Sequence, residues 1–322
     1  MKHLAVLTSG GDAPGMNAAI RAVVRTAIYE KLQVSGVIRG YKGLIGGDII
    51  DMNARSVDNI MQRGGTMLYS ARSTAFTEPE GRAQAAEHLR RRGIEGLVVI
   101  GGDGSFRGAH LLAEEHGIKV VGIPGTIDND IFGTDVTIGF NTAMNIALEA
   151  IDRLRDTGHS HDRLFLVEVM GRHSGHIALH VGLGGGAEEI LLPEHDYDVE
   201  EMVKSIAAGR ERGRSSSIIV IAEGAAKGGA IAIGKRIEAA SGYEVRTSIL
   251  GHIQRGGPPS TRDRVLAARL GYYAVQTLLD GESDVMVGVD KRGTVRVPLP
   301  ETWKQQKEID WQLYEINKIL AG

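Results

Sequence analysis

The sequence LAVLTSGGDAPGMN, residues 4–17, joins a short apolar run to a glycine-rich turn and then to a segment with helical spacing. Apolar runs such as residues 4–7 are typical of buried strands, and Gly10, Gly11 and Gly15 permit a tight turn that exposes backbone N–H groups. The start of the following helix adds partial positive charge to this turn. The stretch therefore predicts a strand, a turn suited to a phosphate, and a helix.

The same alternation of short apolar runs and longer segments of helical period continues along the chain. It predicts βα units around mostly parallel, buried sheets, and hence an α/β fold. The predicted strands are residues 4–7, 34–38, 97–100, 120–123, 164–169, 190–192, 218–222 and 285–289. The predicted helices are residues 16–30, 81–92, 105–116, 142–157, 174–181, 199–212, 264–279 and 303–320.

Length and composition narrow the class of protein. The 322 residues suggest about two domains. The 44 glycines, about twice the average usage, fit tight turns and close backbone approach. A formal net charge of -3 lacks the basic footprint of a nucleic-acid binder. With no cysteine, no signal-peptide core and no apolar run of membrane-spanning length, we expect a soluble cytoplasmic protein without disulfides.

Two further strand ends carry residues suited to phosphate chemistry. The predicted strand 97–100 leads into Gly101–Ser105 and a helix, and the strand 120–123 leads into Pro124–Asp130. Ligands of open α/β sheets bind beyond the carboxyl ends of the strands. Asp128 and Asp130 could act as a general base and as an acid serving a metal-bound phosphate, with Asp103 on the neighbouring turn. The alternative is that these aspartates cap backbone N–H groups in turns without a ligand.

The established phosphate-binding motifs do not match. The chain has no G-x-x-x-x-G-K-[ST], which excludes P-loop NTPases. Residues 182–187 fit G-x-G-x-x-A, but they follow a predicted helix rather than a strand, so the dehydrogenase hypothesis is weak. His173, His176 and His180 share one helical face without an acid beside them, which favours ordinary histidines over a zinc site.

Six distinctive segments occur in order over nearly the whole chain: Gly10–Asn17, Gly101–Ser105, Pro124–Asp130, Glu168–Arg172, Ala222–Gly224 and Leu250–Gly257. Together they closely resemble the bacterial ATP-dependent 6-phosphofructokinase family. The resemblance implies two similar doubly wound, Rossmann-like, three-layer domains with mostly parallel sheets. Residues 1–139 and about 252–302 would form the ATP-binding domain. Residues 140–251 and a C-terminal helix of about 303–322 would form the fructose 6-phosphate-binding domain.

The family chemistry is Mg²⁺-dependent transfer of the γ-phosphoryl group of ATP to the 1-hydroxyl of fructose 6-phosphate in glycolysis. By resemblance, Asp128 is the proton acceptor, Asp103 is the Mg²⁺-associated acid, and Arg72 and Arg172 offset transition-state charge. Positioning and charge neutralisation are what phosphoryl transfer requires. The ATP site would comprise Gly11, Arg72, Ser73, Gly102, Asp103, Gly104 and Ser105, with Gly11 and Thr126 also catalytic.

The resemblance also implies a set of substrate ligands rich in arginine. Guanidinium groups hold a phosphate dianion well, because they bond it in bidentate fashion. In the family, the residues matching Arg163 and Arg246 come from a neighbouring subunit, which implies a homotetramer with shared active sites. The implied substrate ligands are Thr126, Ile127, Asp128, Asp130, Arg163, Met170, Gly171, Arg172, Glu223, Arg246, His252, Ile253, Gln254 and Arg255.

The resemblance to this fold does not by itself identify the phosphoryl donor, because some relatives of the fold use pyrophosphate instead of ATP. Those enzymes typically carry an acid at the position of Gly104 and a lysine at that of Gly125. Both residues fill the space of the nucleotide α-phosphate, so two glycines indicate ATP. Pyrophosphate as donor, and a non-catalytic nucleotide or sugar-phosphate sensor, remain the alternatives.

A second anion site is implied by the resemblance, although Arg21 and Arg25 by themselves fit a solvated helix face. The family binds ADP and phosphoenolpyruvate there as effectors, between subunits. Ser215 and Ser216 stand where relatives carry basic residues, so fewer cations would hold an effector. Asn59 stands where well-known relatives carry an acid, and Thr77 replaces an arginine that some relatives have in the active site. The matching allosteric residues are Arg21, Arg25, Arg55, Arg155, Gly186, Ala187, Glu188, Arg212 and Arg214.

Overall fold

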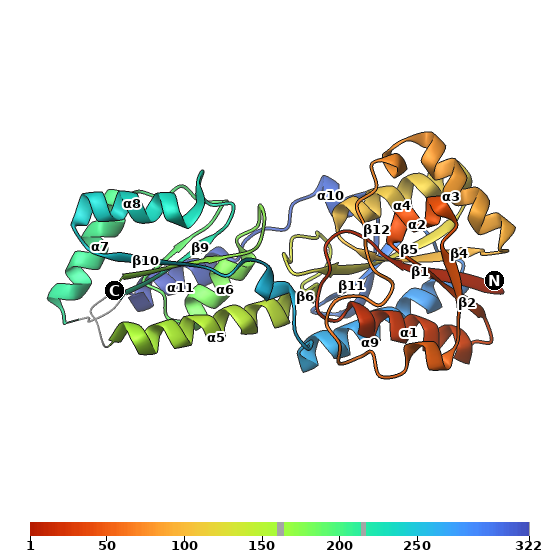
Figure 1. The fold of residues 1–322 in the computed structure, drawn as a ribbon, viewed down its shortest axis with the longest axis horizontal. Helices are drawn as coiled ribbons and strands as arrows, with labels where there is room; N and C mark the ends of the chain where they lie inside the picture. The colour runs from red at the N-terminus through yellow and green to blue at the C-terminus, as the bar shows by residue number, and fades with distance from the viewer. Residues whose placement is uncertain (160–163, 214–216, 322) are drawn as a thin grey trace. The chain divides into compact units, whose positions relative to one another are not determined.

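A computed structural model describes residues 1–159, 164–213 and 217–321 of the chain. The chain divides into two compact units. Unit 1 contains Met1–Ile127, Ile131–Thr142 and Arg255–Lys307, and unit 2 contains Asp128–Asp130, Ala143–Gln254 and Glu308–Gly322. Each unit has its own sheet (Figure 1).

The sheet of unit 1 has the strand order β12-β11-β5-β4-β1-β2-β3, with β6 paired on β5. The strands from β11 to β2 are parallel, whereas β3 and β12 run antiparallel at the two edges. Its strands are β1 (His3–Thr8), β2 (Gln33–Val37), β3 (Ile49–Met52), β4 (Gly96–Gly101), β5 (Lys119–Thr126), β6 (Ile138–Gly139), β11 (Val285–Asp290) and β12 (Gly293–Pro298).

Helices cover both faces of this sheet, because β1 and β4 are apolar on both sides and wholly buried. On one face α1 (Met16–Tyr29) packs along α9 (Thr261–Leu279). The other face carries α2 (Gly40–Gly46), α3 (Pro79–Arg91), α4 (Asp103–His116) and α10 (Glu301–Lys304) (Figure 1). Short 3-10 turns lie at η1 (Ala54–Val57) and η2 (Ala75–Thr77).

Unit 2 repeats the arrangement around a smaller parallel sheet, β10-β7-β9-β8. The strands are β7 (Leu164–Val169), β8 (Glu189–Leu191), β9 (Ser217–Ala222) and β10 (Val245–Ile249). One face carries α5 (Phe140–His159), α6 (His176–Gly184) and α11 (Trp311–Ala321), and the other carries α7 (Val199–Glu211) and α8 (Gly229–Ser241) (Figure 1). A 3-10 turn, η3 (Gly251–Arg255), follows β10.

The predicted α/β class with mostly parallel sheets is confirmed, and each strand predicted from the sequence is present. The structure adds β3, β6, β10 and β12 together with helices α2 and α8. These elements have weak signals. The strand β10, for example, has no buried position in the largely polar sequence VRTSI, and α8 follows Gly228 in a left-handed conformation.

The predicted single helix over residues 303–320 is wrong, because the chain forms two helices there, α10 and α11. Residue Gln305 is extended, with φ -111° and ψ 148°, and Asp310 restarts the helix by accepting a hydrogen bond from the N–H of Leu313 at 3.1 Å. Trp303 therefore packs on the core of unit 1, whereas Trp311 lies in unit 2 beside His195. The two tryptophans do not share a helix face.

Within the described ranges, the chain has no helix with both the length and the apolar character needed to cross a membrane.

Candidate functional site

The first glycine turn follows β1, as the sequence predicts. The N–H of Ser9 donates to the carbonyl of Ile100 at 2.9 Å, which extends the β1–β4 pairing into the turn. Gly15 precedes α1 with φ 110°, a conformation that disfavours other residues. A Cβ added to Gly11 would lie 2.7 Å from Nη1 of Arg255, and this guanidinium donates to the carbonyl of Asp12 at 3.0 Å. Glycine at position 11 thus lets a cation approach the backbone of the turn.

The second glycine turn follows β4 and packs against the first. A Cβ on Gly101 would lie 2.6 Å from the carbonyl oxygen of Ser9, so only glycine fits at this contact. Asp103 is the first residue of α4 and is half-buried. A Cβ on Gly102 or Gly104 would meet nothing within 4 Å. The turn therefore presents a carboxylate, a helix N-terminus and open space at the end of β4.

Gly125 differs from Gly104 in this respect. A Cβ on Gly125 would lie 3.0 Å from Cγ2 of Ile100 and 3.2 Å from Cε of Met16. The resemblance to the family predicts that glycine at both positions leaves space for a nucleotide. Of these two glycines, Gly104 has open space beside it. Gly125 packs closely against β4 and α1, and this close packing explains why a glycine is needed there.

The segment carrying Arg72 and Ser73 is anchored to the first turn. Oγ of Ser70 donates to the carbonyl of Gly10 at 2.8 Å, and Oγ1 of Thr8 donates to the carbonyl of Tyr69 at 2.8 Å. Arg72 itself is exposed, so its guanidinium is accessible beside the glycine turn. The sequence prediction that Gly11 and Arg72 belong to one site thus has a structural connection in unit 1.

The aromatic pair Tyr41 and Phe76 joins this segment to α4. The two rings stack with centroids 3.9 Å apart at an interplanar angle of 11°. The hydroxyl of Tyr41 donates to the carbonyl of Ser105 at 2.5 Å, and burial raises the pKa of this phenol well above its usual value. Tyr41 therefore remains a neutral donor, and it holds the second glycine turn to η2.

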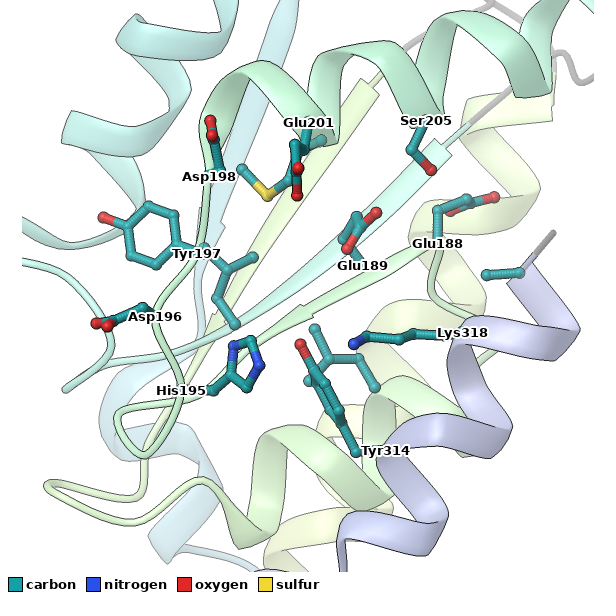
Figure 2. A pocket seen from close by; sticks show the side chains of 14 residues that line it. Glu188, Glu189, His195, Asp196, Tyr197, Asp198, Glu201, Ser205, Tyr314 and Lys318 are labelled. Atoms are coloured by element: carbon teal, nitrogen blue, oxygen red, sulfur yellow. The ribbon is translucent and has the colours of Figure 1, made fainter.

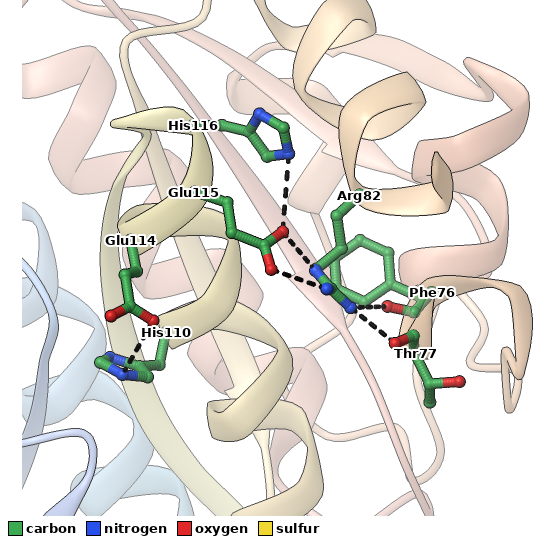
Figure 3. Close-up of polar contacts among 7 residues, drawn as sticks. All are labelled: Phe76, Thr77, Arg82, His110, Glu114, Glu115 and His116. Carbon is green, nitrogen blue, oxygen red and sulfur yellow. Dashed lines mark hydrogen bonds and ion pairs between the residues drawn. The ribbon is translucent and has the colours of Figure 1, made fainter. Parts of the chain in front are cut away.

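Arg82 fixes η2 from the other side (Figure 3). Its side chain is 5% exposed, and it pairs in bidentate fashion with Glu115 through Nε and Nη2 at 2.6 and 2.7 Å. Nη1 donates to the carbonyls of Phe76 at 3.0 Å and Thr77 at 2.7 Å. The guanidinium lowers the pKa of the Glu115 carboxyl, chiefly through this hydrogen bond. Arg82 therefore ties the chain just beyond Arg72 and Ser73 to α4.

A buried carboxylate, Asp263, holds the strand β6 against β5. Asp263 is 1% exposed and accepts from the N–H groups of Gly139 at 2.9 Å and Thr142 at 2.8 Å. Burial raises the pKa of Asp263, whereas these donors oppose that rise. Because β6 pairs with Gly125 and Thr126 at the end of β5, Asp263 orders the strand end that leads into Asp128.

The acidic segment Asp128–Asp130 belongs to unit 2. Asp128 is 6% exposed, and its carbonyl accepts from Oγ of Ser174 at 3.0 Å. Asn129 takes a left-handed conformation with φ 53°. The segment is therefore held as a defined turn against the start of α6, with a nearly buried carboxylate.

The turn after β7 positions Arg172. Gly171 has φ 145°, and a Cβ there would lie 2.3 Å from the carbonyl oxygen of Ser174. Arg172 itself has φ 58°, and its N–H donates to the Glu223 carboxylate at 2.6 Å. A left-handed arginine is uncommon and is often found at functional sites. The turn leaves the Arg172 side chain exposed, beside the segment that bonds Asp128 through Ser174.

The segment after β10 closes the same part of unit 2. Oε1 of Gln254 accepts from the N–H of Met170 at 2.8 Å, and its Nε2 is buried without a hydrogen-bond partner among the described residues. His252 and Ile253 are exposed in η3. Buried donors normally have partners, so Nε2 of Gln254 is available to a bound molecule.

The predicted site residues thus gather in two groups, one in each unit. Arg255 lies in unit 1, although the sequence analysis grouped it with the sugar ligands; Arg163 lies outside the described residues, and Arg246 is exposed on β10. Unit 1 holds Gly11, Arg72, Ser73, Gly102, Asp103, Gly104, Ser105, Thr126, Ile127 and Arg255. Unit 2 holds Asp128, Asp130, Met170, Gly171, Arg172, Glu223, Arg246, His252, Ile253 and Gln254.

The carboxylates fit a magnesium ion that arrives with a nucleotide. No group of three or more His, Cys, Asp or Glu residues in the described part of the chain is arranged to hold a metal ion. Mg²⁺ commonly takes one or two carboxylates together with waters and substrate phosphates. Asp103, half-buried at the N-terminus of α4 beside open space, is such a single carboxylate.

The residues of the second anion site are also divided. Arg21, Arg25 and Arg55 lie in unit 1, whereas Arg155, Gly186, Ala187, Glu188 and Arg212 lie in unit 2; Arg214, Ser215 and Ser216 are outside the described residues. Arg25 pairs with Asp58 at 2.6 Å, and Arg155 donates to the carbonyl of Gly186 at 2.7 Å. The pair of Arg25 is half-exposed and contributes little energy, so a phosphate can replace it.

Residues that order the site were missed in the sequence analysis. Arg82 and its partner Glu115 are 33 positions apart, and no sequence pattern links them. Asp263 had a signal, because Ser260 and Asp263 have the spacing of a helix-capping pair and Oγ of Ser260 accepts from the N–H of Asp263 at 3.2 Å. Tyr41 and Ser174 carry no local signal of their roles.

Comparisons with known proteins show the family of the chain. Residues 3–278 match the family described as phosphofructokinase. The chain is 54% identical over 321 residues to ATP-dependent 6-phosphofructokinase of Bacillus licheniformis, with 100% of each chain covered. The same identity and coverage hold for ATP-dependent 6-phosphofructokinase 1 of Thermus thermophilus.

Solved structures show the same fold. Phosphofructokinase from Saccharomyces cerevisiae gives a TM-score of 0.90 at 36% identity, covering 100% of this chain and 48% of the yeast chain. Pyrophosphate-dependent phosphofructokinase from Marinobacter aquaeolei gives a TM-score of 0.85 at 25% identity, covering 97% of this chain and 86% of that one. These matches confirm the doubly wound, mostly parallel architecture.

Proposed function

The chain belongs to the phosphofructokinase family, and from this premise we propose that it catalyses ATP-dependent phosphorylation of fructose 6-phosphate. The products are fructose 1,6-bisphosphate and ADP, as in glycolysis. The observation that carries this proposal is the full-length identity of 54% to curated ATP-dependent 6-phosphofructokinases. A glycolytic reaction and a chain without cysteine favour a cytoplasmic location.

Asp128 is proposed as the proton acceptor. Its carboxylate takes the proton of the sugar 1-hydroxyl while the hydroxyl oxygen bonds to the γ-phosphorus, and the bond from that phosphorus to the bridging oxygen breaks to leave ADP. Three features of the chain suit this role: 6% exposure, the bond from Ser174 that holds the turn, and the adjacent left-handed Asn129. A base held in one orientation avoids the cost of ordering it during the reaction.

Charge neutralisation is proposed for Arg72, Arg172 and the two glycine turns. The exposed guanidinium groups offset the charge on the transferring group, and the N–H groups of the turns after β1 and β4 bind the nucleotide phosphates. Mg²⁺, when bound, neutralises phosphate oxygens, and Asp103 is the residue that would hold it.

We favour ATP over pyrophosphate as donor because of Gly104. A carboxylate at this position would enter the open space beside the turn and repel an α-phosphate. Gly125 packs against Ile100 and Met16, so a glycine at this position does not distinguish ATP from pyrophosphate as the donor.

Binding of the sugar phosphate is proposed for Glu223, His252 and the arginines 163 and 246, the last two acting across a subunit boundary in a homotetramer. Arg246 suits such a role because its side chain is 52% exposed and lies on the edge strand β10. Its ion pair with Glu244 is exposed on both sides, so exchange for a phosphate costs little.

Regulation by ADP and phosphoenolpyruvate is proposed at the second anion site. Arg21 and Arg25 on α1 and Arg155 beside Gly186 supply cations in the two units, and Glu188 supplies a carboxylate for an effector-bound Mg²⁺. Glu188 accepts from the N–H of Ile218 at 2.6 Å, which holds its side chain in place.

The deciding experiment measures Mg²⁺-dependent ADP release from ATP in the presence of fructose 6-phosphate. A parallel assay replaces ATP with pyrophosphate and measures formation of fructose 1,6-bisphosphate. Turnover with pyrophosphate alone would overturn the donor assignment, and tight ADP binding without turnover would favour a sensor. Asp128→Asn should lower kcat by about two orders of magnitude or more with little change in KM, because an amide cannot accept the proton. Asp152→Asn, which changes an exposed carboxylate on α5, is the matched control.

A further inference from the structure

Unit 2 contains a pocket that the phosphotransfer site does not use and that shares one residue, Glu188, with the proposed effector site (Figure 2). Its volume is about 320 Å³, at the small end of the range for ligand sites. Strand β8 forms its floor, the start of α7 forms one wall, and α11 forms the other. All of these elements lie in unit 2, so the pocket is complete within one unit.

A tyrosine of α11 faces this pocket. Tyr314 is 8% exposed, and its hydroxyl makes no hydrogen bond within the described residues. Figure 2 shows the hydroxyl pointing into the pocket, toward Glu189 on the floor. Burial, together with the carboxylates of Glu189 and Glu315, raises the pKa of this phenol, so it remains protonated. The side chain is largely enclosed and its hydroxyl opens onto the pocket, so this oxygen can accept a hydrogen bond from a ligand there.

The pocket is strongly acidic. Burial raises the pKa of Glu189, whereas a hydrogen bond from Ser205 and the charge of Lys318 oppose the rise; Glu188 and Glu201 add smaller upward contributions. The floor and the α7 wall carry the lining carboxylates Glu188, Glu189, Asp196, Asp198 and Glu201. Glu188 and Glu189 are half-buried, whereas Asp196, Asp198 and Glu201 are exposed at the mouth of the pocket. Acids gathered in this way favour a cation and disfavour an anion.

The one lysine lining the pocket, Lys318, offsets only part of this charge. Its Nζ pairs with Glu315 at 3.3 Å and lies 4.6 Å from the ring centroid of Tyr314. Glu315 does not line the pocket, so the lysine is shared with an acid outside it. The contact with Tyr314 shows that this ring already receives an ammonium group.

A bare metal ion does not fit this pocket. Across residues 1–159, 164–213 and 217–321, no three His, Cys, Asp or Glu side chains converge as a metal site would require. The acids are instead spread along the walls, with apolar surface from Ile190 and Met202 between them. Carboxylates separated by apolar surface suit an organic cation with ammonium groups on an aliphatic chain.

We propose that this pocket binds a small aliphatic amine cation of the diamine class. One ammonium group donates to Glu189 and to the hydroxyl oxygen of Tyr314, a second donates to Glu201, and the methylene chain lies on Ile190 and Met202. The site is independent of the proposed phosphotransfer reaction, because none of these residues belongs to the phosphotransfer site.

The test is calorimetric titration of the full chain with 1,4-diaminobutane at low and at physiological salt. We expect one site per chain, weaker binding at higher salt, and no heat from 1,4-butanediol, which has the same length without charge. Binding that saturates at many equivalents per chain would identify an adventitious surface effect and overturn the proposal, as would equal binding of the diol.

Variants locate the site. Tyr314→Phe removes the hydroxyl alone and should weaken binding about fivefold, and Glu201→Gln should weaken it about tenfold. Glu200→Gln is the matched control, because Glu200 is exposed on the same helix and does not line the pocket. Kinetic constants for phosphotransfer, measured in parallel, should be unchanged in all three variants. Unaltered diamine affinity in both Tyr314→Phe and Glu201→Gln would refute the proposed site.

Discussion

Arg82→Met should loosen the ATP-binding half of unit 1. Methionine retains much of the apolar volume of the arginine stem but loses both bonds to Glu115 and both bonds to the carbonyls of Phe76 and Thr77. Breaking a buried ion pair by removing one partner costs about 3–5 kcal/mol. Glu115 is 30% exposed, so water can solvate the carboxylate that remains. We therefore expect unit 1 to lose about 2–3 kcal/mol of unfolding free energy.

The two tryptophans allow this loss to be assigned to unit 1. Trp303 packs on the unit 1 core, with the guanidinium of Arg107 5.6 Å from its ring, whereas Trp311 lies in unit 2. In a Trp311→Phe background, fluorescence during urea unfolding therefore reports on unit 1. Arg82→Met should also raise KM for ATP more than KM for fructose 6-phosphate, because Arg82 anchors the chain just beyond Arg72 and Ser73.

The acid pH range supplies a second readout. Arg82 lowers the pKa of Glu115 in the folded protein, so this carboxylate contributes stability above its ordinary pKa, and the contribution is lost as pH falls through its folded value. The difference between wild type and Arg82→Met should therefore narrow at acid pH. Arg91→Met is the control: its pair with Glu87 on the same helix is exposed, and its loss should cost less than about 0.5 kcal/mol. Equal losses in the two variants would refute the reasoning.

Three further outcomes follow from the geometry. Gly171→Ala should lower kcat/KM for fructose 6-phosphate in steady-state assays, because its Cβ would lie 2.3 Å from the carbonyl oxygen of Ser174; unchanged kinetics would mean that this turn does not position Arg172. Asp263→Asn should lower kcat and speed hydrogen exchange in residues 125–130, since the amide has one acceptor oxygen and its NH2 must face the N–H of either Gly139 or Thr142; slow exchange as in wild type would contradict this. Gly104→Asp should raise KM for ATP. An unaltered KM would show that Gly104 does not determine which phosphoryl donor the enzyme uses.

The repeating pattern of strand, glycine turn and helix was sufficient to predict the α/β class and the two glycine turns. Glycine at positions 10, 15 and 101 is required by backbone conformation or by close contacts, and such local requirements are visible in a sequence. The acids Asp103 and Asp128 were recognised because they follow strands directly, where chain order alone puts them at the same edge of a sheet.

Long-range contacts were not predictable in this way. The pairing of Arg82 with Glu115 depends on how α3 packs on α4, and neither residue differs in its local pattern from an exposed helical charge. The role given to Gly125 needed the side chains of Ile100 and Met16, which come from other elements. Helical spacing likewise suggested one helix for Trp303 and Trp311, because it contains no information about which unit each segment packs against.

The late position of β11 in the chain has a consequence for synthesis on the ribosome. Strand β5 ends at residue 126, and its neighbour β11 begins at residue 285, about 160 residues later. At about 5–20 residues per second, the nascent chain carries β5 as an open edge for about 8–30 s. The wholly buried residues Val120, Val121 and Ile123 on that edge remain uncovered during this interval. Translation speed between β5 and β11 should therefore influence how much of the protein aggregates before its larger sheet is complete.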